Sequence, residues 1–211
     1  MRSTADDRRR TAGLGASFAM IPTLLMLLAG CGRGARPAWR LTDVRGHLPD
    51  LRFQLTDGSS RAVTAKDYLG KIIVLYFGYT NCPDACPLTL THLHIVMQRL
   101  GTQARDVRIL FVSVDPARDT PAVMRRYVAA FDSRAVGLTG TMTEIEAMAK
   151  RYRVAFTRGP DEGNGAYEVN HSSAIYFFDR QGRARLLAAP ANSDGDVVHD
   201  LRLLISAGPK S

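Results

Sequence analysis

Cysteine is scarce in this sequence: there are only three cysteines among its 211 residues. A chain of this length can bury roughly 70% of the surface that its unfolded form exposes, so it needs no disulfide bonds to stabilise its fold. The cysteines, Cys31, Cys82 and Cys86, are therefore free for roles other than holding the fold together.

Long runs of like charge are also missing. The formal net charge is +8, but acidic residues are interspersed with the basic ones. The aromatic residues Phe77, Phe111 and Phe177 lie in apolar runs typical of a protein core. A nucleic-acid-binding protein would concentrate its positive charge on one face or helix. We therefore expect no nucleic-acid partner, whereas the charge is compatible with an anionic membrane surface.

The first part of the chain has the pattern of an export signal. A basic stretch, Arg8 to Arg10, precedes the uncharged and mostly apolar residues 13–30, which end in Leu28-Ala29-Gly30 just before Cys31. A basic start, an apolar centre and small residues at a cleavage point describe a secretory signal. The last four residues resemble a bacterial lipoprotein cleavage box. The resemblance implies that residues 1–30 are a signal peptide and that Cys31 carries the lipid.

An uncleaved membrane anchor is the alternative interpretation of this leader. Residues 13–30 reach only the lower length limit of ~18 residues for a membrane span, and Pro22 weakens the stretch as a helix. In either case we expect the protein in the bacterial cell envelope, facing the periplasm or another extracytoplasmic space. Residues 31–44 would then be the lipidated cysteine and a flexible tether, and residues 45–211 a single domain.

Strand and helix patterns alternate through that domain. Residues 71–79 and 107–114 form apolar runs typical of buried strands, and residues 87–100 and 196–205 have apolar positions at helical spacing. Further strands are expected at residues 51–55, 173–178 and 184–188, and two helices are expected to begin after Thr120 and at Thr143, where Glu146 completes a capping box. This order predicts an α/β fold with a central mixed β-sheet flanked by helices.

Cys82 and Cys86 lie between a predicted buried strand and the next helix. In α/β sheets this carboxyl end of a strand is where functional residues usually gather. Pro87 predicts that the helix begins there, with Cys86 at its cap. The helix dipole would then lower the pKa of both thiols. A structural disulfide is a weak alternative, because so short a loop gains little entropic stabilisation from closure.

Two thiolates suit soft or borderline metals: copper(I), zinc or an iron–sulfur cluster. A closed zinc site needs four ligands, and the sequence has no second cysteine pair. A third ligand would come from the histidines. We interpret four of them as surface or entry-segment residues, namely His47, His92, His94 and His199. The remaining one, His171, precedes a predicted buried strand, and its position alone fits a metal ligand and a structural histidine equally well.

Three segments together resemble the signature blocks of the Sco/SenC family: residues 78–87 (GYTNCPDACP), 113–121 (SVDPARDTP) and 169–172 (VNHS). The similarity extends from about residue 45 to residue 205. It implies a thioredoxin-like fold and one copper ion per chain, as Cu(I), Cu(II) or both, bound by Cys82, Cys86 and His171. It also implies a metallochaperone that delivers copper to, or matures, the binuclear copper centre of cytochrome c oxidase. The expected partners are the copper-bearing oxidase subunit, a membrane reached through the lipid anchor and, as a further candidate, another periplasmic copper chaperone.

One position departs from the family pattern, since Asn170 stands where the family commonly has aspartate. Asp115 and Asp119 match family positions, and we interpret them as turn and helix-cap residues.

A thiol–disulfide oxidoreductase is the alternative function. It would need only the redox pair Cys82 and Cys86. The usual redox pair is Cys-x-x-Cys, whereas three residues separate the cysteines here. We do not expect an enzyme, although reductase activity of the pair stays open. His171 discriminates between the two functions, because only a copper carrier needs it.

Overall fold

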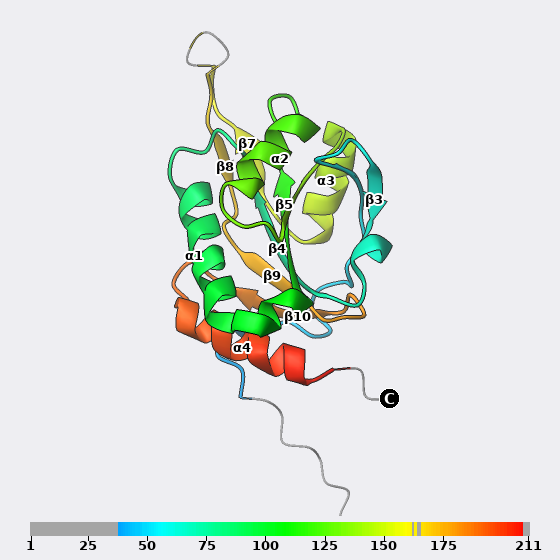
Figure 1. Cartoon of the computed structure of the whole chain (residues 1–211). Coiled ribbons are helices and arrows are strands. Elements are labelled where there is room, and N and C mark those ends of the chain that lie inside the picture. Colours follow the sequence, from blue (N-terminus) through cyan, green and yellow to red (C-terminus); the bar gives the residue numbers. More distant parts are fainter. Residues whose placement is uncertain (1–37, 162, 164–165, 209–211) are drawn as a thin grey trace, which may run out of the picture. The chain divides into compact units, whose positions relative to one another are not determined.

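The computed structural model describes residues 38–161, 163 and 166–208. They form one mixed sheet of eight strands in the order β1-β10-β9-β4-β5-β6-β2-β3, and a separate two-stranded sheet, β7-β8 (Figure 1). The strands are β1 (Thr42–Asp43), β2 (Gln54–Asp57), β3 (Ala62–Thr64), β4 (Ile72–Gly78), β5 (Val107–Ser113), β6 (Ala135–Thr139), β7 (Phe156–Arg158), β8 (Val169–His171), β9 (Ile175–Phe178) and β10 (Ala184–Ala188).

The centre of the large sheet is formed by its most apolar strands. All seven residues of β4 are buried, and β4 pairs in parallel with β5, from Ile72 opposite Val107 to Gly78 opposite Ser113. On its other side β4 pairs antiparallel with β9. Strands covered on both faces need continuous rather than alternating hydrophobicity, which explains the apolar runs in the sequence.

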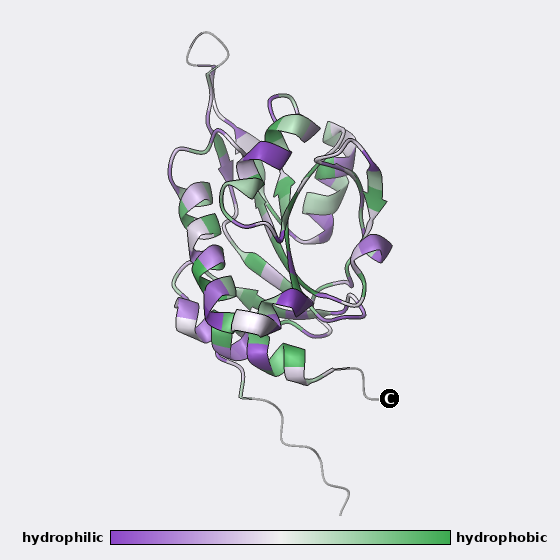
Figure 2. Cartoon of the chain, in the orientation of Figure 1, coloured by the Kyte–Doolittle hydropathy of each residue, from purple (hydrophilic) through white to green (hydrophobic). Residues whose placement is uncertain are grey.

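Four α-helices accompany the sheet: α1 (Ala85–Leu100), α2 (Pro121–Ala129), α3 (Met142–Arg151) and α4 (Asp194–Ser206). Short 3₁₀ turns occupy Ala65–Tyr68 and Gly101–Asp106. Helix α1 packs against α4, and α2 packs against β6. Figure 2 shows hydrophobic residues along the central strands, while the helices combine hydrophobic and hydrophilic residues. Such amphipathic helices bury one side and leave the other to solvent.

The predicted α/β fold with a central mixed sheet and flanking helices is confirmed. The structure differs in detail: β2 begins at Gln54 rather than Leu51. Helix α3 uses the earlier of two overlapping capping boxes, formed by Thr141 and Glu144 instead of Thr143 and Glu146. Strands β1, β3, β6, β7 and β8 were not expected; all of them except β6 have only two or three residues, too few for a sequence pattern.

The last residues of the predicted tether belong to the folded domain. The backbone N–H groups of Arg40 and Leu41 donate to the carboxylate of Asp200 on α4, and β1 pairs with β10. The leader, Cys31 and the start of the tether lie outside the described residues. Within the part of the chain that the structure describes, no helix combines the length and the apolar character needed to cross a bilayer.

Candidate metal centre

The two cysteines lie at the transition from β4 to α1, at the carboxyl end of the central strands. Helix α1 begins at Ala85, not at Pro87 as predicted, so Cys86 lies within the first turn. Proline is tolerated there because the first N–H groups of a helix have no intrahelical partner. The N–H of Cys86 donates instead to Sγ of Cys82, at 3.4 Å. Cys82 is half-buried and Cys86 is fully buried.

His171 ends β8, and the fold brings it to the thiols although it lies 85 residues beyond Cys86 in the sequence. Its Nε2 is 3.3 Å from Sγ of Cys86. The candidate ligand atoms of Cys82, Cys86 and His171 all lie within 4.8 Å of one another. The structure therefore brings together the three residues that the family resemblance singled out.

A backbone contact fixes the protonation pattern of the imidazole. Nδ1 of His171 is 3.0 Å from the carbonyl oxygen of Ser172. A carbonyl can only accept, so Nδ1 carries the proton and Nε2 presents its lone pair towards the sulfur of Cys86. A metal-ligating histidine is typically held in this way by a second hydrogen bond.

Burial favours the neutral forms of Cys86 and His171. It raises the pKa of the Cys86 thiol to about 12 and lowers the pKa of His171. The expectation that the helix dipole lowers the pKa of both thiols is therefore wrong for Cys86. The cost of placing a thiolate in a dry environment exceeds the benefit of a helix N-terminus. A metal ion that binds Cys86 must first displace its proton, so binding releases a proton to solvent.

Aromatic rings and a glycine enclose the site. The rings of Tyr76 and Tyr79 meet the imidazole of His171 edge-on, and the Tyr76 hydroxyl lies 3.8 Å from Sγ of Cys86. Gly78 leaves room for that sulfur: a Cβ at this position would lie 2.7 Å from Sγ of Cys86 and 2.6 Å from the ring of Phe111. Sequence reasoning assigned no function to these residues; a glycine closing a buried apolar strand was the available signal.

Asp119 anchors the loop before the cysteines and is not a helix cap. Its carboxylate accepts hydrogen bonds from the hydroxyl and N–H of Thr80 and from the hydroxyl of Ser113. Thr120 caps α2 instead, by accepting from the N–H of Val123. Burial raises the pKa of Asp119. The interpretation of Asp119 as a cap was wrong because this carboxylate faces a segment 39 residues away in the sequence.

The other histidines do not join the site. His92, His94 and His199 contact the carboxylates of Asp194, Asp132 and Asp200, respectively. His47 is exposed in the entry segment. Asn170 is exposed between Val169 and His171, and successive side chains of a strand point to opposite faces. The departure from the family pattern therefore lies on the face of β8 that points away from the thiols.

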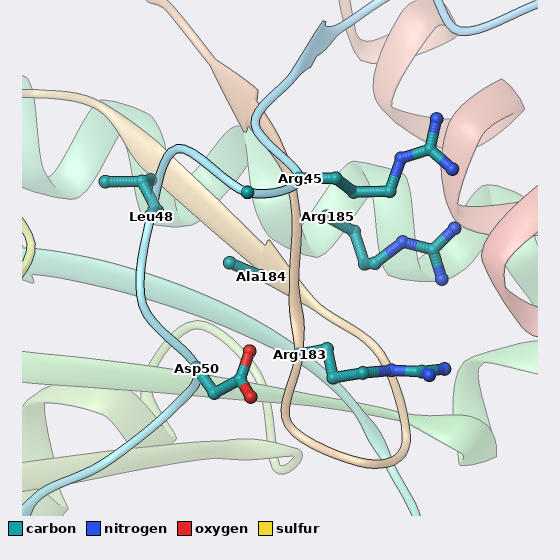
Figure 3. Close-up of a pocket in the computed structure, with 7 residues that line it drawn as sticks. Arg45, Leu48, Asp50, Arg183, Ala184 and Arg185 are labelled. Carbon is teal, nitrogen blue, oxygen red and sulfur yellow. The ribbon is translucent and has the colours of Figure 1, made fainter.

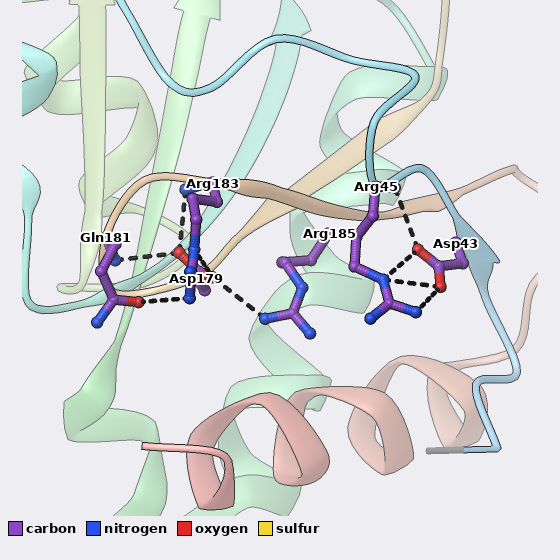
Figure 4. A network of polar contacts seen from close by, with 6 residues as sticks. All are labelled: Asp43, Arg45, Asp179, Gln181, Arg183 and Arg185. Atoms are coloured by element: carbon purple, nitrogen blue, oxygen red, sulfur yellow. Dashed lines mark hydrogen bonds and ion pairs between the residues drawn. The ribbon is translucent and has the colours of Figure 1, made fainter. Parts of the chain in front are cut away.

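A hollow lined by arginines lies at the other end of the central sheet, beside the β9–β10 turn (Figure 3). Its guanidinium groups already have anionic partners. Arg45 pairs with Asp43, and Arg183 and Arg185 both pair with Asp179 (Figure 4). Asp43 and Asp179 offset two of the three positive charges, and Asp50 also lines the hollow, so the hollow offers little net attraction to an anionic ligand.

Comparison with known proteins places these features in a family. A family model described as SCO1/SenC matches residues 46–206. The chain is 39% identical over 132 residues to human "Protein SCO1 homolog, mitochondrial", covering 62% of this chain and 44% of the relative. It is 41% identical over 157 residues to bovine "Protein SCO2 homolog, mitochondrial", covering 74% and 59%. The chain thus matches about half the length of these curated relatives.

Solved structures agree with the sequence comparison. Bradyrhizobium japonicum ScoI with copper bound is 38% identical, with a TM-score of 0.68 over 74% of this chain and 99% of that one. Yeast Sco1 with copper bound is 31% identical, with a TM-score of 0.71 over 78% and 92% of the two chains. The predicted thioredoxin-like fold is confirmed by these neighbours.

Proposed function

This chain belongs to the SCO1/SenC family, and on that premise we propose that it is a copper carrier whose domain binds one copper ion through Cys82, Cys86 and His171. The observation that carries the proposal is the convergence of two sulfurs and one imidazole nitrogen within 4.8 Å. Relatives of the same fold, from Bradyrhizobium japonicum and yeast, are copper-bound in their solved structures.

The donor set favours copper over zinc. Two thiolates suit copper(I), and an added imidazole gives a site that also accepts copper(II). A closed zinc site would need a fourth ligand. Within the described residues, the group of candidate ligands holds no fourth histidine, cysteine or carboxylate. Cys82 is only half-buried, so one side of the site stays open for a partner's thiols to take the metal.

The cellular role follows from the family resemblance. The proposed acceptor is the copper-bearing subunit of cytochrome c oxidase, whose binuclear centre the carrier would load or mature, with another periplasmic copper chaperone as a further candidate partner. The proposed location is the outer face of a bacterial membrane, where the leader would place the domain. The alternative function remains a thiol–disulfide oxidoreductase that uses only Cys82 and Cys86.

The substitution His171→Ala separates the two functions. Copper(II) prefers nitrogen ligands more than copper(I) does, so copper(II) binding should weaken severely and copper(I) binding less. The Cys82–Cys86 couple should still oxidise and reduce, because thiol exchange needs only the sulfurs. Copper stoichiometry of the reduced chain from Gly32 onward, near one for the wild type, would be measured for both oxidation states.

Complementation of a deletion strain provides the cellular arm of this test. In the carrier function, His171→Ala fails to restore cytochrome oxidase activity at low copper, although its thiols remain competent. Full rescue by this variant at low copper would falsify the carrier mechanism and support the reductase.

The lipid anchor is a separate part of the proposal. Cleavage before Cys31 would leave a lipidated cysteine at the new N-terminus. We expect the wild-type protein to show the mass of the lipidated, cleaved form, and Cys31→Ser to remain unlipidated or unprocessed. Mass spectrometry of the membrane-extracted protein decides between them. An intact, unmodified N-terminus in the wild type contradicts the anchor while leaving the copper site untouched.

A further inference from the structure

The third candidate ligand sits on a hairpin outside the main sheet. Among the described residues, strands β7 and β8 pair only with each other, from Phe156 opposite His171 to Arg158 opposite Val169. Within the same part of the chain, no strand ladder joins this hairpin to the eight-stranded sheet, and residues 172–174 link His171 to β9, which pairs with β4. The distance between the imidazole and the thiols therefore depends on this short link and on side-chain contacts between the hairpin and the rest of the domain.

Tyr167, two residues before β8, makes such a contact. Its side chain is buried, and its hydroxyl donates to Oδ1 of Asp115 at 2.6 Å. Asp115 lies in the segment between β5 and α2, and its other carboxylate oxygen accepts from Nε of Arg118. A tyrosine of the hairpin is thus bonded to a buried carboxylate of the domain body.

Two arginines enclose the ring of Tyr167. The guanidinium carbon of Arg118 lies 3.5 Å from the ring centroid, and that of Arg158 lies 3.7 Å from it. Two guanidinium groups this close cannot share one face of a ring, so they lie on opposite faces. Arg158 belongs to β7 and Arg118 to the body. The aromatic ring therefore joins the hairpin to the body between two cation–π contacts.

The same cluster reaches the imidazole through a second tyrosine. Arg118 lies 5.8 Å from the ring centroid of Tyr79, and that ring meets the imidazole of His171 edge-on at 5.9 Å. Tyr79 directly follows β4, on the segment that leads to Cys82. Arg118 thus contacts one tyrosine from each of the two segments that carry the candidate ligands.

We propose that Tyr167 is a positioning residue that latches the His171 hairpin to the segment between β5 and α2, and so sets how firmly the imidazole is presented to the thiols. Its link to copper rests on the proposed function above. Loosening the latch disturbs the nitrogen ligand more than the sulfurs, because Cys82 lies in the loop before α1 and Cys86 in the first turn of α1, both outside the hairpin. Copper(II), which depends more on nitrogen, should respond more strongly than copper(I).

The substitution Tyr167→Phe is the sharpest test. It removes the hydroxyl and keeps the ring between Arg118 and Arg158, and Asp115 retains its contact with Arg118. Tyr152→Phe is the matched control, because the Tyr152 hydroxyl also bridges two segments: it donates to the carbonyl of Asp50 and accepts from the N–H of Arg52. Both variants lose a tyrosine hydroxyl, but only one loses a contact to the hairpin.

Two measurements on the full chain, purified in detergent and reduced, decide the proposal. Without metal, amide hydrogen exchange in residues 156–158 and 169–171 should accelerate about fivefold in Tyr167→Phe, the factor expected for one lost hydrogen bond, and stay unchanged in Tyr152→Phe. With copper, the affinity for copper(II) should fall about fivefold or more, and that for copper(I) less than about twofold.

The exchange measurement and the copper measurement can each contradict the proposal. Hairpin exchange that is the same in wild type and Tyr167→Phe contradicts the latch, whatever copper does. Faster exchange with equal losses of copper(I) and copper(II) affinity, or with none, contradicts the role in presenting the imidazole. A wild-type chain that binds no copper contradicts the proposed function, and the metal-free arm still decides the latch. Tyr167→Leu also removes the ring, so it should accelerate hairpin exchange and weaken copper(II) binding more than Tyr167→Phe does. If Tyr167→Leu does not fold, Tyr167→Phe is the variant that tests the proposal.

Discussion

Cys82 and Cys86 are four residues apart, yet their surroundings differ. Cys82 is half-buried in the loop and accepts a hydrogen bond through its sulfur, whereas Cys86 is fully buried behind Gly78 and Tyr76. The raised pKa of Cys86, about 12, means that the folded, metal-free domain keeps this thiol protonated at neutral pH. In the proposed copper site the two sulfurs would therefore have different tasks: Cys82 would be open to partners, and Cys86 would hold the metal from inside.

Alkylation kinetics should reveal this difference. In the reduced, metal-free chain from Gly32 onward, the single-cysteine variant that keeps Cys82 (Cys86→Ser) should react with iodoacetamide at least about tenfold faster at pH 7 than the one that keeps Cys86 (Cys82→Ser), because the accessible thiolate is the nucleophile. Because burial, the largest cause of the raised pKa of Cys86, remains in Cys82→Ser, the rate for Cys86 should rise about tenfold per pH unit above neutrality. In denaturant both variants should react alike. Equal rates in the folded state would contradict the buried, protonated state of Cys86.

The β4–α1 connection is the element that builds the site. Strand β4 ends at Gly78, whose missing side chain leaves room for Sγ of Cys86 against Phe111. The loop that follows is tied to Asp119 through Thr80. Strand, loop and helix start thus form one packed unit, in which the positions of both sulfurs are set by contacts outside the cysteine motif itself.

Gly78→Ala should disturb this unit. The added methyl group would lie 2.7 Å from Sγ of Cys86, and overpacking of this kind lowers the free energy of unfolding by about 1–3 kcal/mol. The apparent affinity for copper(I) should fall as well, since the displaced sulfur is a proposed ligand. Denaturant unfolding and competitive copper titration measure the two effects.

Gly195→Ala is the control for Gly78→Ala. At Gly195 a Cβ would meet only an ordinary contact, 3.5 Å from the hydroxyl of Ser193, inside α4. Alanine is favoured over glycine within a helix, so this variant should be unchanged or up to about 1 kcal/mol more stable. If Gly78→Ala has the stability and copper affinity of the wild type, Cys86 can move away from the added methyl group without loss of either, and the close packing at Gly78 does not position the sulfur.

At the scale of the whole molecule, the two ends of the domain are tied together. The buried carboxylate of Asp200 on α4 accepts from the N–H groups of Arg40 and Leu41, across 160 and 159 residues of sequence. Helix α4 packs in turn on α1, the helix that carries Cys86. The point where a tether would enter is therefore fixed to the body of the domain through α4.

Asp200→Ala should weaken the domain without altering its metal site. The buried N–H of Leu41 and the part-buried N–H of Arg40 would lose a charged acceptor, which lowers the free energy of unfolding by about 1–3 kcal/mol. Asp43→Ala, which breaks the exposed pair with Arg45, should cost less than about 1 kcal/mol. Copper stoichiometry should stay near one in both variants. A stable Asp200→Ala domain, or one that no longer binds copper, would contradict this assignment.

Features that depend on local sequence pattern were predicted correctly. All seven residues of β4 and six of the seven residues of β5 are buried, as expected from apolar runs that only a covered central strand can use. Thr120 and Pro121 start α2 as their local chemistry predicts. The sequence also predicted that the cysteine pair lies where a strand is followed by a helix. His171 was identified as a candidate ligand from the family resemblance, because its spacing alone had left its role undecided.

Properties that depend on contacts between residues distant in the sequence could not be predicted and became visible only in the folded domain. The pKa of Cys86 rises because the whole core removes water from it, and no window around the motif contains that information. Asp119 faces Thr80 instead of capping a helix, and Tyr167 meets Asp115 across 52 residues. Hydrogen bonds and desolvation depend on which residues are close in space, and the tertiary fold determines which residues those are.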